Sequence, residues 1–172
     1  LLYSPKACGL PRVLEKVARW VDGFSCSSLF ELTLIERVCG PKSLRHFVSP
    51  LITEDTLDGI GNQLDYLTFN SLTQWALLGA PARAPTPVGI RVNPELSFIR
   101  DPRYDPCRPN SKLGVPISKL AEAAADPAWR RHINGLHFHN NCDCSDFTGL
   151  LATARHIQDV IPGLLERLDW IN

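Results

Sequence analysis

The stretch Gly135-Leu136-His137-Phe138-His139-Asn140-Asn141-Cys142 has the pattern of a short buried strand that ends in a polar loop. Alternate side chains of a strand share a face, so we expect His137 and His139 on one side and Phe138 on the other. A strand end that exposes an imidazole beside polar residues is a candidate position for chemistry. Whether it forms a site depends on which other residues the fold brings to the same place.

Apolar, strand-like segments alternate with segments of helical period along most of the chain. The expected strands cover residues 1–6, 23–26, 44–51, 66–70, 88–93, 135–139 and 169–172. Strands followed by helices, without hairpin signals, predict parallel pairing through helical crossovers. The chain has no G-x-G-x-x-G segment and no P-loop, and six such units with the start of a seventh favour a barrel over an open sheet. We therefore predict an α/β fold in which residues 1–172 form one incomplete domain, a partial (β/α)8 TIM barrel without its last strands.

Several local signals mark where elements begin and end. Ser28 and Ser71 each precede a Glu or Gln by three residues, the spacing of a capping box at a helix start. Residues 79–87 are rich in Pro and Ala and predict a connector, while residues 117–133 have a mostly helical pattern. The Pro-rich stretch 95–111 has little periodicity and predicts a long loop, which in a compact domain is often functional.

Composition limits the classes of protein to consider. The 172 residues are 44% hydrophobic and 21% charged, which is enough apolar material for a core. Eighteen basic residues balance 18 acidic ones, which argues against a nucleic-acid or membrane surface held by bulk charge. No apolar run approaches the roughly 20 residues of a membrane helix. Six dispersed cysteines favour reduced thiols and a cytoplasmic location, and the absence of Met suggests a fragment of a longer protein.

In a barrel, the active site lies at the carboxyl ends of the strands. Lys6 falls there, and burial in a low-dielectric cavity would free its amine for Schiff-base chemistry; the alternative is a lysine that extends to solvent. Arg91 lies on an otherwise apolar strand, where a buried guanidinium needs a partner and suggests a role in a site. Asn70 and Ser71 are expected to be turn and cap residues.

A metal site is the competing interpretation of the histidine strand. His137, His139, Cys142 and Cys144 place four potential zinc ligands within eight residues. Their spacing is not that of a standard structural zinc site, and a catalytic zinc usually takes a more distant ligand, so we predict no bound metal. His46, His132 and His156 have no such neighbours and are expected to be ordinary surface or core residues.

Motifs along nearly the whole chain carry a resemblance to a known family. They are Tyr3-Ser4-Pro5-Lys6-Ala7, residues 22–31, residues 67–71, Gly89-Ile90-Arg91-Val92-Asn93-Pro94-Glu95, Asp105-Pro106-Cys107 with residues 111–115, and Gly135-Leu136-His137-Phe138-His139. In their order and spacing the chain resembles the carboxynorspermidine (carboxyspermidine) decarboxylases. These are pyridoxal-phosphate enzymes of the alanine racemase and ornithine decarboxylase fold type.

The resemblance implies roles for five residues. Lys6 matches the lysine that binds pyridoxal phosphate covalently, and His139 matches the histidine stacked on the cofactor ring. Arg91 would lie beneath the ring near its phenolic oxygen. Ser25 stands where ornithine decarboxylases carry an aspartate, and Cys142 where they carry a phosphate-binding serine. Both departures favour the carboxynorspermidine branch.

The implied activity is pyridoxal-phosphate-dependent decarboxylation of carboxynorspermidine or carboxyspermidine in polyamine biosynthesis, by a cytoplasmic homodimer with a small polyamine-carboxylate substrate. The glycine-rich phosphate loop, the partner of the pyridine nitrogen and a C-terminal β domain would follow Asn172, so we expect residues 1–172 alone to have little or no activity. Alternatives are a decarboxylase or racemase of the same fold, acting on diaminopimelate, ornithine, arginine or alanine. A non-enzymatic pyridoxal-phosphate-binding barrel and a zinc protein complete the set.

Overall fold

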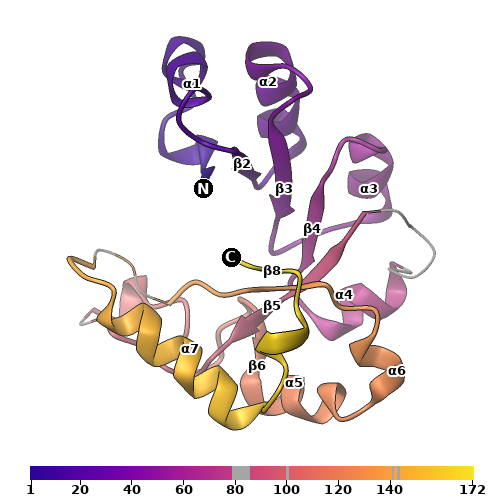
Figure 1. Ribbon diagram of the computed structural model, residues 1–172, viewed down its shortest axis with the longest axis vertical. Helices are drawn as coiled ribbons and strands as arrows, with labels where there is room; N and C mark the ends of the chain where they lie inside the picture. The colour runs from indigo at the N-terminus through magenta and orange to yellow at the C-terminus, as the bar shows by residue number, and fades with distance from the viewer. Residues whose placement is uncertain (79–85, 100, 141, 143) are drawn as a thin grey trace.

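The computed structural model describes residues 1–78, 86–99, 101–140, 142 and 144–172, and its strands form one curved parallel sheet (Figure 1). The strand order is β1-β2-β3-β4-β5-β7-β8, and β6 pairs with the end of β5. The strands are β1 (Leu2–Tyr3), β2 (Gly23–Cys26), β3 (Leu44–Val48), β4 (Tyr66–Phe69), β5 (Val88–Asn93), β6 (Val115–Pro116), β7 (Gly135–His137) and β8 (Trp170–Ile171). The α-helices are α1 (Pro11–Val17), α2 (Leu29–Cys39), α3 (Glu54–Ile60), α4 (Leu72–Leu77), α5 (Ile117–Ala124), α6 (Pro127–Arg130) and α7 (Thr148–Val160), and the 3-10 helices are η1 (Pro5–Ala7), η3 (Pro102–Tyr104) and η4 (Leu165–Arg167). Parallel strands with helical crossovers confirm the predicted partial barrel.

Several boundaries differ from the expectation, and the expected strands 44–51 and 135–139 end at Val48 and His137. The first strand ends at Tyr3, because Pro5 has no N–H to donate to a ladder and begins the 3-10 turn η1. The single helix expected over residues 117–133 is two, because Asp126 caps a new helix that has Pro127 in its first turn. The two-residue strand β6 was not predicted, since so short a segment has no measurable period. The expected connector at 79–87 lies largely outside the described residues.

Serine caps start the helices that follow β2 and β4, as the sequence predicts. The Ser28 side chain accepts a hydrogen bond from the Glu31 N–H, and Ser71 accepts from the Gln74 N–H. The return bond differs from a standard capping box: Glu31 accepts from the N–H of Ser27, one residue before the cap. These caps fix the direction in which the chain leaves the end of each strand.

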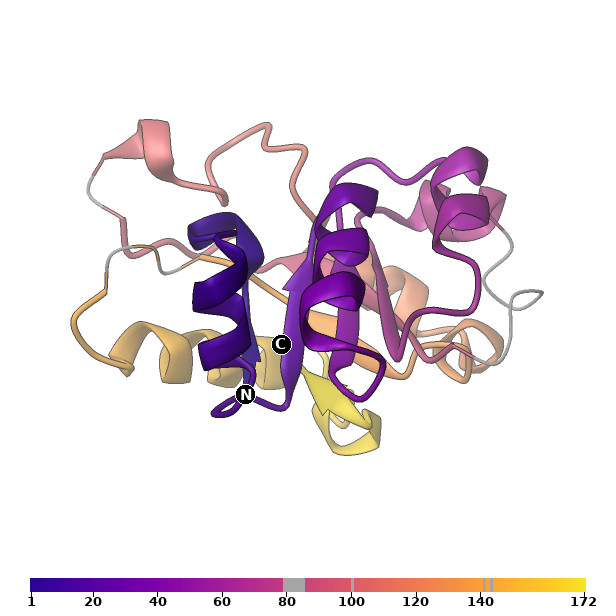
Figure 2. The same ribbon diagram turned by 90° about the horizontal axis from the view of Figure 1, so that it is seen from above.

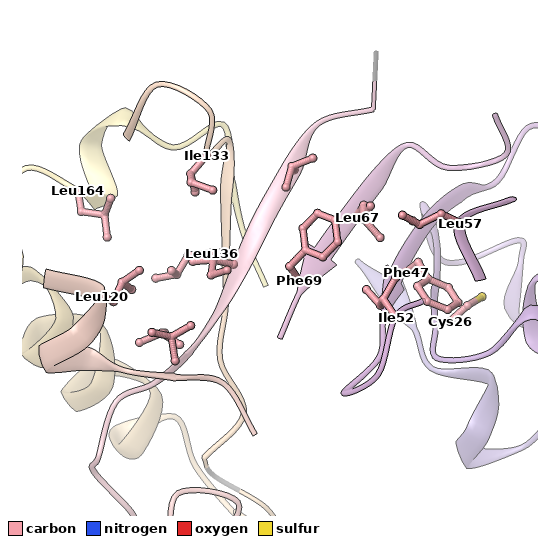
Figure 3. Close-up of a cluster of buried hydrophobic side chains, with 14 of the residues drawn as sticks. Cys26, Phe47, Ile52, Leu57, Leu67, Phe69, Leu120, Ile133, Leu136 and Leu164 are labelled. Carbon is pink, nitrogen blue, oxygen red and sulfur yellow. The ribbon is translucent and has the colours of Figure 1, made fainter. Parts of the chain in front are cut away.

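The convex side of the sheet forms the hydrophobic core beneath the helices. Phe24, Phe47, Phe69, Ile90 and Leu136, one from each of five strands, are almost fully buried there. Figure 3 shows this cluster, with side chains of the sheet packed against those of the surrounding helices. The helices α1 and α2 lie side by side on this face (Figure 2). Burying one such side chain contributes about 1.5–3 kcal/mol.

The concave side is polar near the strand ends and is filled at its base by one indole. Trp170 packs against Gly89 and Gly135, where an added Cβ would lie 2.4 Å and 1.9 Å from its ring atoms. The same indole meets His46 edge-on at a centroid distance of 4.9 Å and Tyr66 at 5.4 Å. Glycine at both positions is therefore required for Trp170 to close the base of the half-barrel. No helix within the described ranges is long and apolar enough to cross a membrane.

Candidate active site

A cavity of about 710 Å³ lies on the concave side, at the carboxyl ends of the strands. Parallel barrels place their active sites at this end. All five residues assigned from the resemblance border the cavity, namely Lys6, Ser25, Arg91, His139 and Cys142. The remaining lining residues are Leu2, Ser4, Cys26, Ser27, Val48, Pro50, Arg103, Tyr104, Pro106, Arg108, Leu113, His137 and Asn172.

Lys6 borders the cavity and is exposed, which agrees with the second of the two alternatives that the sequence left open, a lysine that extends to solvent. It lies on η1 rather than at the end of a strand, and its residue surface is exposed. The cause is local: Pro5 ends the ladder, and β1 pairs only with β2 along the described sheet. The amine still lies close enough to His139 for its charge to lower the pKa of that imidazole.

Arg91 is buried on β5, as its position in the sequence suggested. The side chain is 8% exposed, and its Nε has no hydrogen-bond partner within the described residues. Burial lowers the pKa of this guanidinium, whereas the nearby thiols of Cys107 and Cys142 raise it. A buried donor without a partner is costly, so its presence in the wall of a cavity indicates a place for an anionic or acceptor group.

His139 lies just beyond the end of β7 and is held by two cysteines. Its Nε2 lies 3.1 Å from the Cys142 sulfur, and the Cys107 thiol donates to its carbonyl oxygen at 3.8 Å. Burial, followed by the charges of Arg91 and Lys6, lowers the pKa of His139. The imidazole therefore favours its neutral form.

The structure separates the residues of the alternative zinc site. His139 contacts Cys142, whereas the Nδ1 of His137 lies 2.9 Å from the Asn172 side-chain oxygen. Among the described residues, no group of three or more His, Cys, Asp or Glu side chains is arranged to hold a metal ion. None of the six cysteines forms a disulfide in the structure.

The loop after β5 contributes residues that were not assigned individually. Arg103, Tyr104 and Arg108 border the cavity, and their position in the long loop at 95–111 was the available signal. Asn70 lies at the bend after β4, where a turn residue was expected, and its side chain also holds this loop. Its Nδ2 donates to the Lys112 carbonyl at 2.8 Å, and its Oδ1 accepts from the Gly114 N–H at 3.0 Å.

The charges around the cavity are of one sign. Lys6, Arg91, Arg103 and Arg108 border it, and no Asp or Glu does so within the described residues. Cationic side chains at converging strand ends suit phosphate and carboxylate groups. The fold and the site together define a partial barrel whose cavity suits an anionic cofactor or substrate, with Lys6 among the residues that border it.

Comparison with known proteins identifies the family. The family described as "Pyridoxal-dependent decarboxylase, pyridoxal binding domain" matches residues 1–166. The chain therefore belongs to the pyridoxal-dependent decarboxylases, and the matched part is their pyridoxal-binding domain. The unpartnered Nε of Arg91 in a cation-lined cavity fits this phosphate-bearing cofactor.

Two curated decarboxylases are similar to the chain over most of its length. The chain is 29% identical over 172 residues to a carboxynorspermidine/carboxyspermidine decarboxylase of Herminiimonas arsenicoxydans, covering 100% of this chain and 45% of that protein. It is 32% identical over 155 residues to a carboxyaminopropylagmatine decarboxylase of a Synechocystis species, covering 87% of this chain and 37% of that protein. The chain thus spans less than half the length of the curated relatives it matches.

Solved structures support the fold. A Campylobacter jejuni carboxynorspermidine decarboxylase, crystallised with norspermidine, aligns with a TM-score of 0.79 at 24% identity, over 99% of this chain and 41% of its own. A Helicobacter pylori diaminopimelate decarboxylase also reaches a TM-score of 0.79, at 17% identity, over 96% of this chain and 43% of its own. These likenesses establish the partial barrel and do not separate one substrate from another.

Proposed function

We propose that this chain is the pyridoxal-phosphate-binding part of a decarboxylase that acts on carboxynorspermidine or carboxyspermidine. The observation that carries the proposal is the meeting of Lys6, His139 and the unpartnered Arg91 around one cation-lined cavity. The names of the two curated relatives favour a carboxylated polyamine over diaminopimelate or ornithine. Residues 1–172 would be an incomplete pyridoxal-phosphate-binding barrel domain of this enzyme, which we expect to be a cytoplasmic homodimer.

Each residue has a task that follows from its position. Pyridoxal phosphate, when bound, supplies the electron sink for the electron pair that remains after loss of CO2. Lys6 offers a primary amine at the rim of the cavity, where a cofactor carbonyl is accessible. Arg91 borders the cavity, and its guanidinium would hold an acceptor oxygen of the cofactor.

His139 presents a neutral ring, because burial and two neighbouring cations disfavour its protonation. Its bond to Cys142 restricts how the ring turns, which fixes the surface against which a planar cofactor packs. Ser25 and Cys142 border the same cavity and offer a hydroxyl and a thiol to the ligand. The cationic wall attracts the anionic end of the ligand. The contacts with His139, Ser25 and Cys142 then determine the position of the ligand in the cavity.

Covalent trapping tests the proposal. The full-length protein is mixed with pyridoxal phosphate, reduced with borohydride, digested, and mapped by mass spectrometry. We expect the label on Lys6, and we expect Lys6→Ala to remove it. Lys16→Ala is a matched control, since this lysine lies on α1 and does not border the cavity. Label spread evenly over surface lysines, or stoichiometric zinc with no label, would contradict the proposal.

Turnover separates the substrates. Release of CO2 from carboxynorspermidine, carboxyspermidine, diaminopimelate and ornithine is compared for the enzyme loaded with pyridoxal phosphate and not treated with borohydride. Faster turnover of a carboxylated polyamine supports the assignment. Faster turnover of diaminopimelate or ornithine would keep the cofactor assignment and reject the substrate.

A further inference from the structure

A chain of hydrogen bonds crosses the concave side of the sheet between four strands. His46 Nε2 lies 2.7 Å from the Thr68 hydroxyl, and His46 Nδ1 lies 3.3 Å from Asn172 Nδ2. Asn172 Oδ1 lies 2.9 Å from His137 Nδ1. The two imidazoles are buried and meet edge-on at 6.3 Å, so the chain joins β4, β3, β7 and the residue after β8.

The backbone fixes the amide in the middle of this chain. The Asn172 N–H donates to the Leu136 carbonyl at 2.8 Å, and the Asn172 carbonyl accepts from the Phe138 N–H at 2.9 Å. Asn172 is thus held in the ladder beside β7. Its side-chain amide lies between the two histidine rings, with one polar atom toward each.

An amide determines where the ring protons lie, because its oxygen only accepts and its nitrogen only donates. His137 Nδ1 must carry a hydrogen to donate to Asn172 Oδ1. His46 Nδ1 must be bare to accept from Asn172 Nδ2, so the hydrogen of the neutral His46 ring lies on Nε2 and is donated to Thr68. Burial keeps both rings neutral, because it lowers the pKa of His46 to about 4 and that of His137 to about 3.

If the Asn172 amide were turned over, its nitrogen would face His137 Nδ1. The ring hydrogen of His137 would then lie on Nε2, toward the cavity. The charge of Arg91 decides between these two orientations of the Asn172 amide. Arg91 is the register partner of His137 on the neighbouring strand, and both side chains border the cavity. A positive charge beside the ring favours a lone pair over an N–H on the exposed nitrogen. His137 Nε2 makes no hydrogen bond within the described part of the chain, so it is available to a ligand.

We propose that His137 presents Nε2 to the cavity as a fixed hydrogen-bond acceptor, and that Asn172, His46 and Thr68 are positioning residues that set this tautomer. The acceptor lies beside the Arg91 donor, in a wall whose charged groups are all cationic within the described residues. Such a pair takes a ligand group that carries an N–H or O–H next to an acceptor oxygen. That the ligand is pyridoxal phosphate or its substrate rests on the proposed function, whereas the tautomer does not.

Nitrogen-15 NMR of histidine-labelled protein reads the tautomers directly. We expect Nδ1–H on His137 and Nε2–H on His46 in the ligand-free protein. Asn172→Asp replaces the central donor with an acceptor, so only His46 should change tautomer, while His137 keeps Nδ1–H. If the amide were turned over, only His137 would change, and that result would overturn the proposal.

A remote variant tests positioning against a general loss of structure. Thr68→Val does not touch His137 but removes the acceptor at the far end of the chain, so it should leave His137 with a mixture of tautomers. Asn134→Leu is the control: Asn134 also joins two strands, through Val88 and Asp169, but it lies away from the cavity. An unchanged His137 in Thr68→Val, or an equal change in Asn134→Leu, would reject the positioning role.

Pyridoxal phosphate tests the ligand contact. Addition of the cofactor should move the Nε2 signal of His137 and leave that of His46 nearly unchanged. If borohydride labels Lys6 but the Nε2 signal does not move, the acceptor role is wrong and the proposed function stands. If Lys6 is not labelled while the tautomers are as expected, the proposed function fails and the fixed tautomer stands.

Discussion

Replacing Gly135 with alanine tests how the half-barrel is closed at its base. The added Cβ would lie 1.9 Å from Cε2 and 2.2 Å from Cδ2 of Trp170, against an ordinary carbon contact of about 3.5–4.0 Å. Movement of the indole is opposed by the rings that pack against it, His46 at a centroid distance of 4.9 Å and Tyr66 at 5.4 Å. Overpacking of this kind costs about 1–3 kcal/mol, and the deep overlap places Gly135→Ala toward the upper end.

The sign of the effect should reverse when the indole is removed. In a Trp170→Ala background the new methyl has room, and alanine in a strand is favoured over glycine by about 0.5–1 kcal/mol. The two substitutions should therefore be coupled by about 2.5–4 kcal/mol, the overpacking cost plus the gain that replaces it. Equilibrium urea unfolding followed by circular dichroism measures the free energy of unfolding of four proteins. They are the unsubstituted protein, the two single variants and the double variant. Gly9→Ala is the control, since its Cβ would meet atoms at 3.6 Å and 3.7 Å, an ordinary contact. Additive costs in the double variant would refute this account of the closure.

Three further predictions concern the cavity and its wall. Arg91→Met removes a buried cation whose Nε lacks a partner, so we expect the free energy of unfolding to rise by about 1 kcal/mol or more. Borohydride labelling of Lys6 should fall about tenfold in that variant, as expected for one lost charged hydrogen bond; a drop in stability would contradict the first part. The pKa of His46 is lowered from 6.5 to about 4 and that of His137 from 6.5 to about 3, so the unfolded chain binds more protons below pH 6.5. Stability should therefore fall as the pH drops from about 6.5 toward 4, by up to about 1.4 kcal/mol per pH unit for each ring, and urea midpoints at several pH values should show a shallower slope in His46→Gln. Asn70→Ala removes two hydrogen bonds to the loop after β5, which should cost about 1–3 kcal/mol and speed amide exchange in that loop, whereas unchanged exchange would show that the loop is held elsewhere.

The order of strands and helices was predictable from the sequence, because the hydrophobic period of each segment is a local property. Their regular alternation then predicted the parallel sheet. Arg91 stood out as a charged residue on an otherwise apolar strand, and the rule for parallel barrels placed it near His139 at the strand ends. The exposure of Lys6 was not predictable in this way, because it depends on one missing N–H at Pro5 and on the position of β1 in the sheet.

The polar contacts across the sheet could not be predicted from any local pattern in the sequence. His46 has no notable neighbour in sequence and was expected to be an ordinary residue, yet its partner Asn172 lies 126 residues away. Asn70 likewise bonds to a loop 42 and 44 residues further along. Both contacts depend on the register between strands that the sequence does not specify. Residue identity marked these side chains as hydrogen-bonding groups, and only the fold supplied their partners.

The charge of the cavity wall bears on how a carboxylated polyamine would lie in it. Such a ligand has an anionic end and several amines, and the amines need acceptors. Within the described residues the wall offers Lys6, Arg91, Arg103 and Arg108 to the anion, and only neutral acceptors such as His137 to the amines. If the proposed substrate is correct, its carboxylate end must face this wall and its amine chain must point away, because the opposite orientation would bring ammonium groups beside four cations. The neutral acceptor of His137 beside Arg91 then allows the anionic end of the ligand to carry one N–H or O–H group.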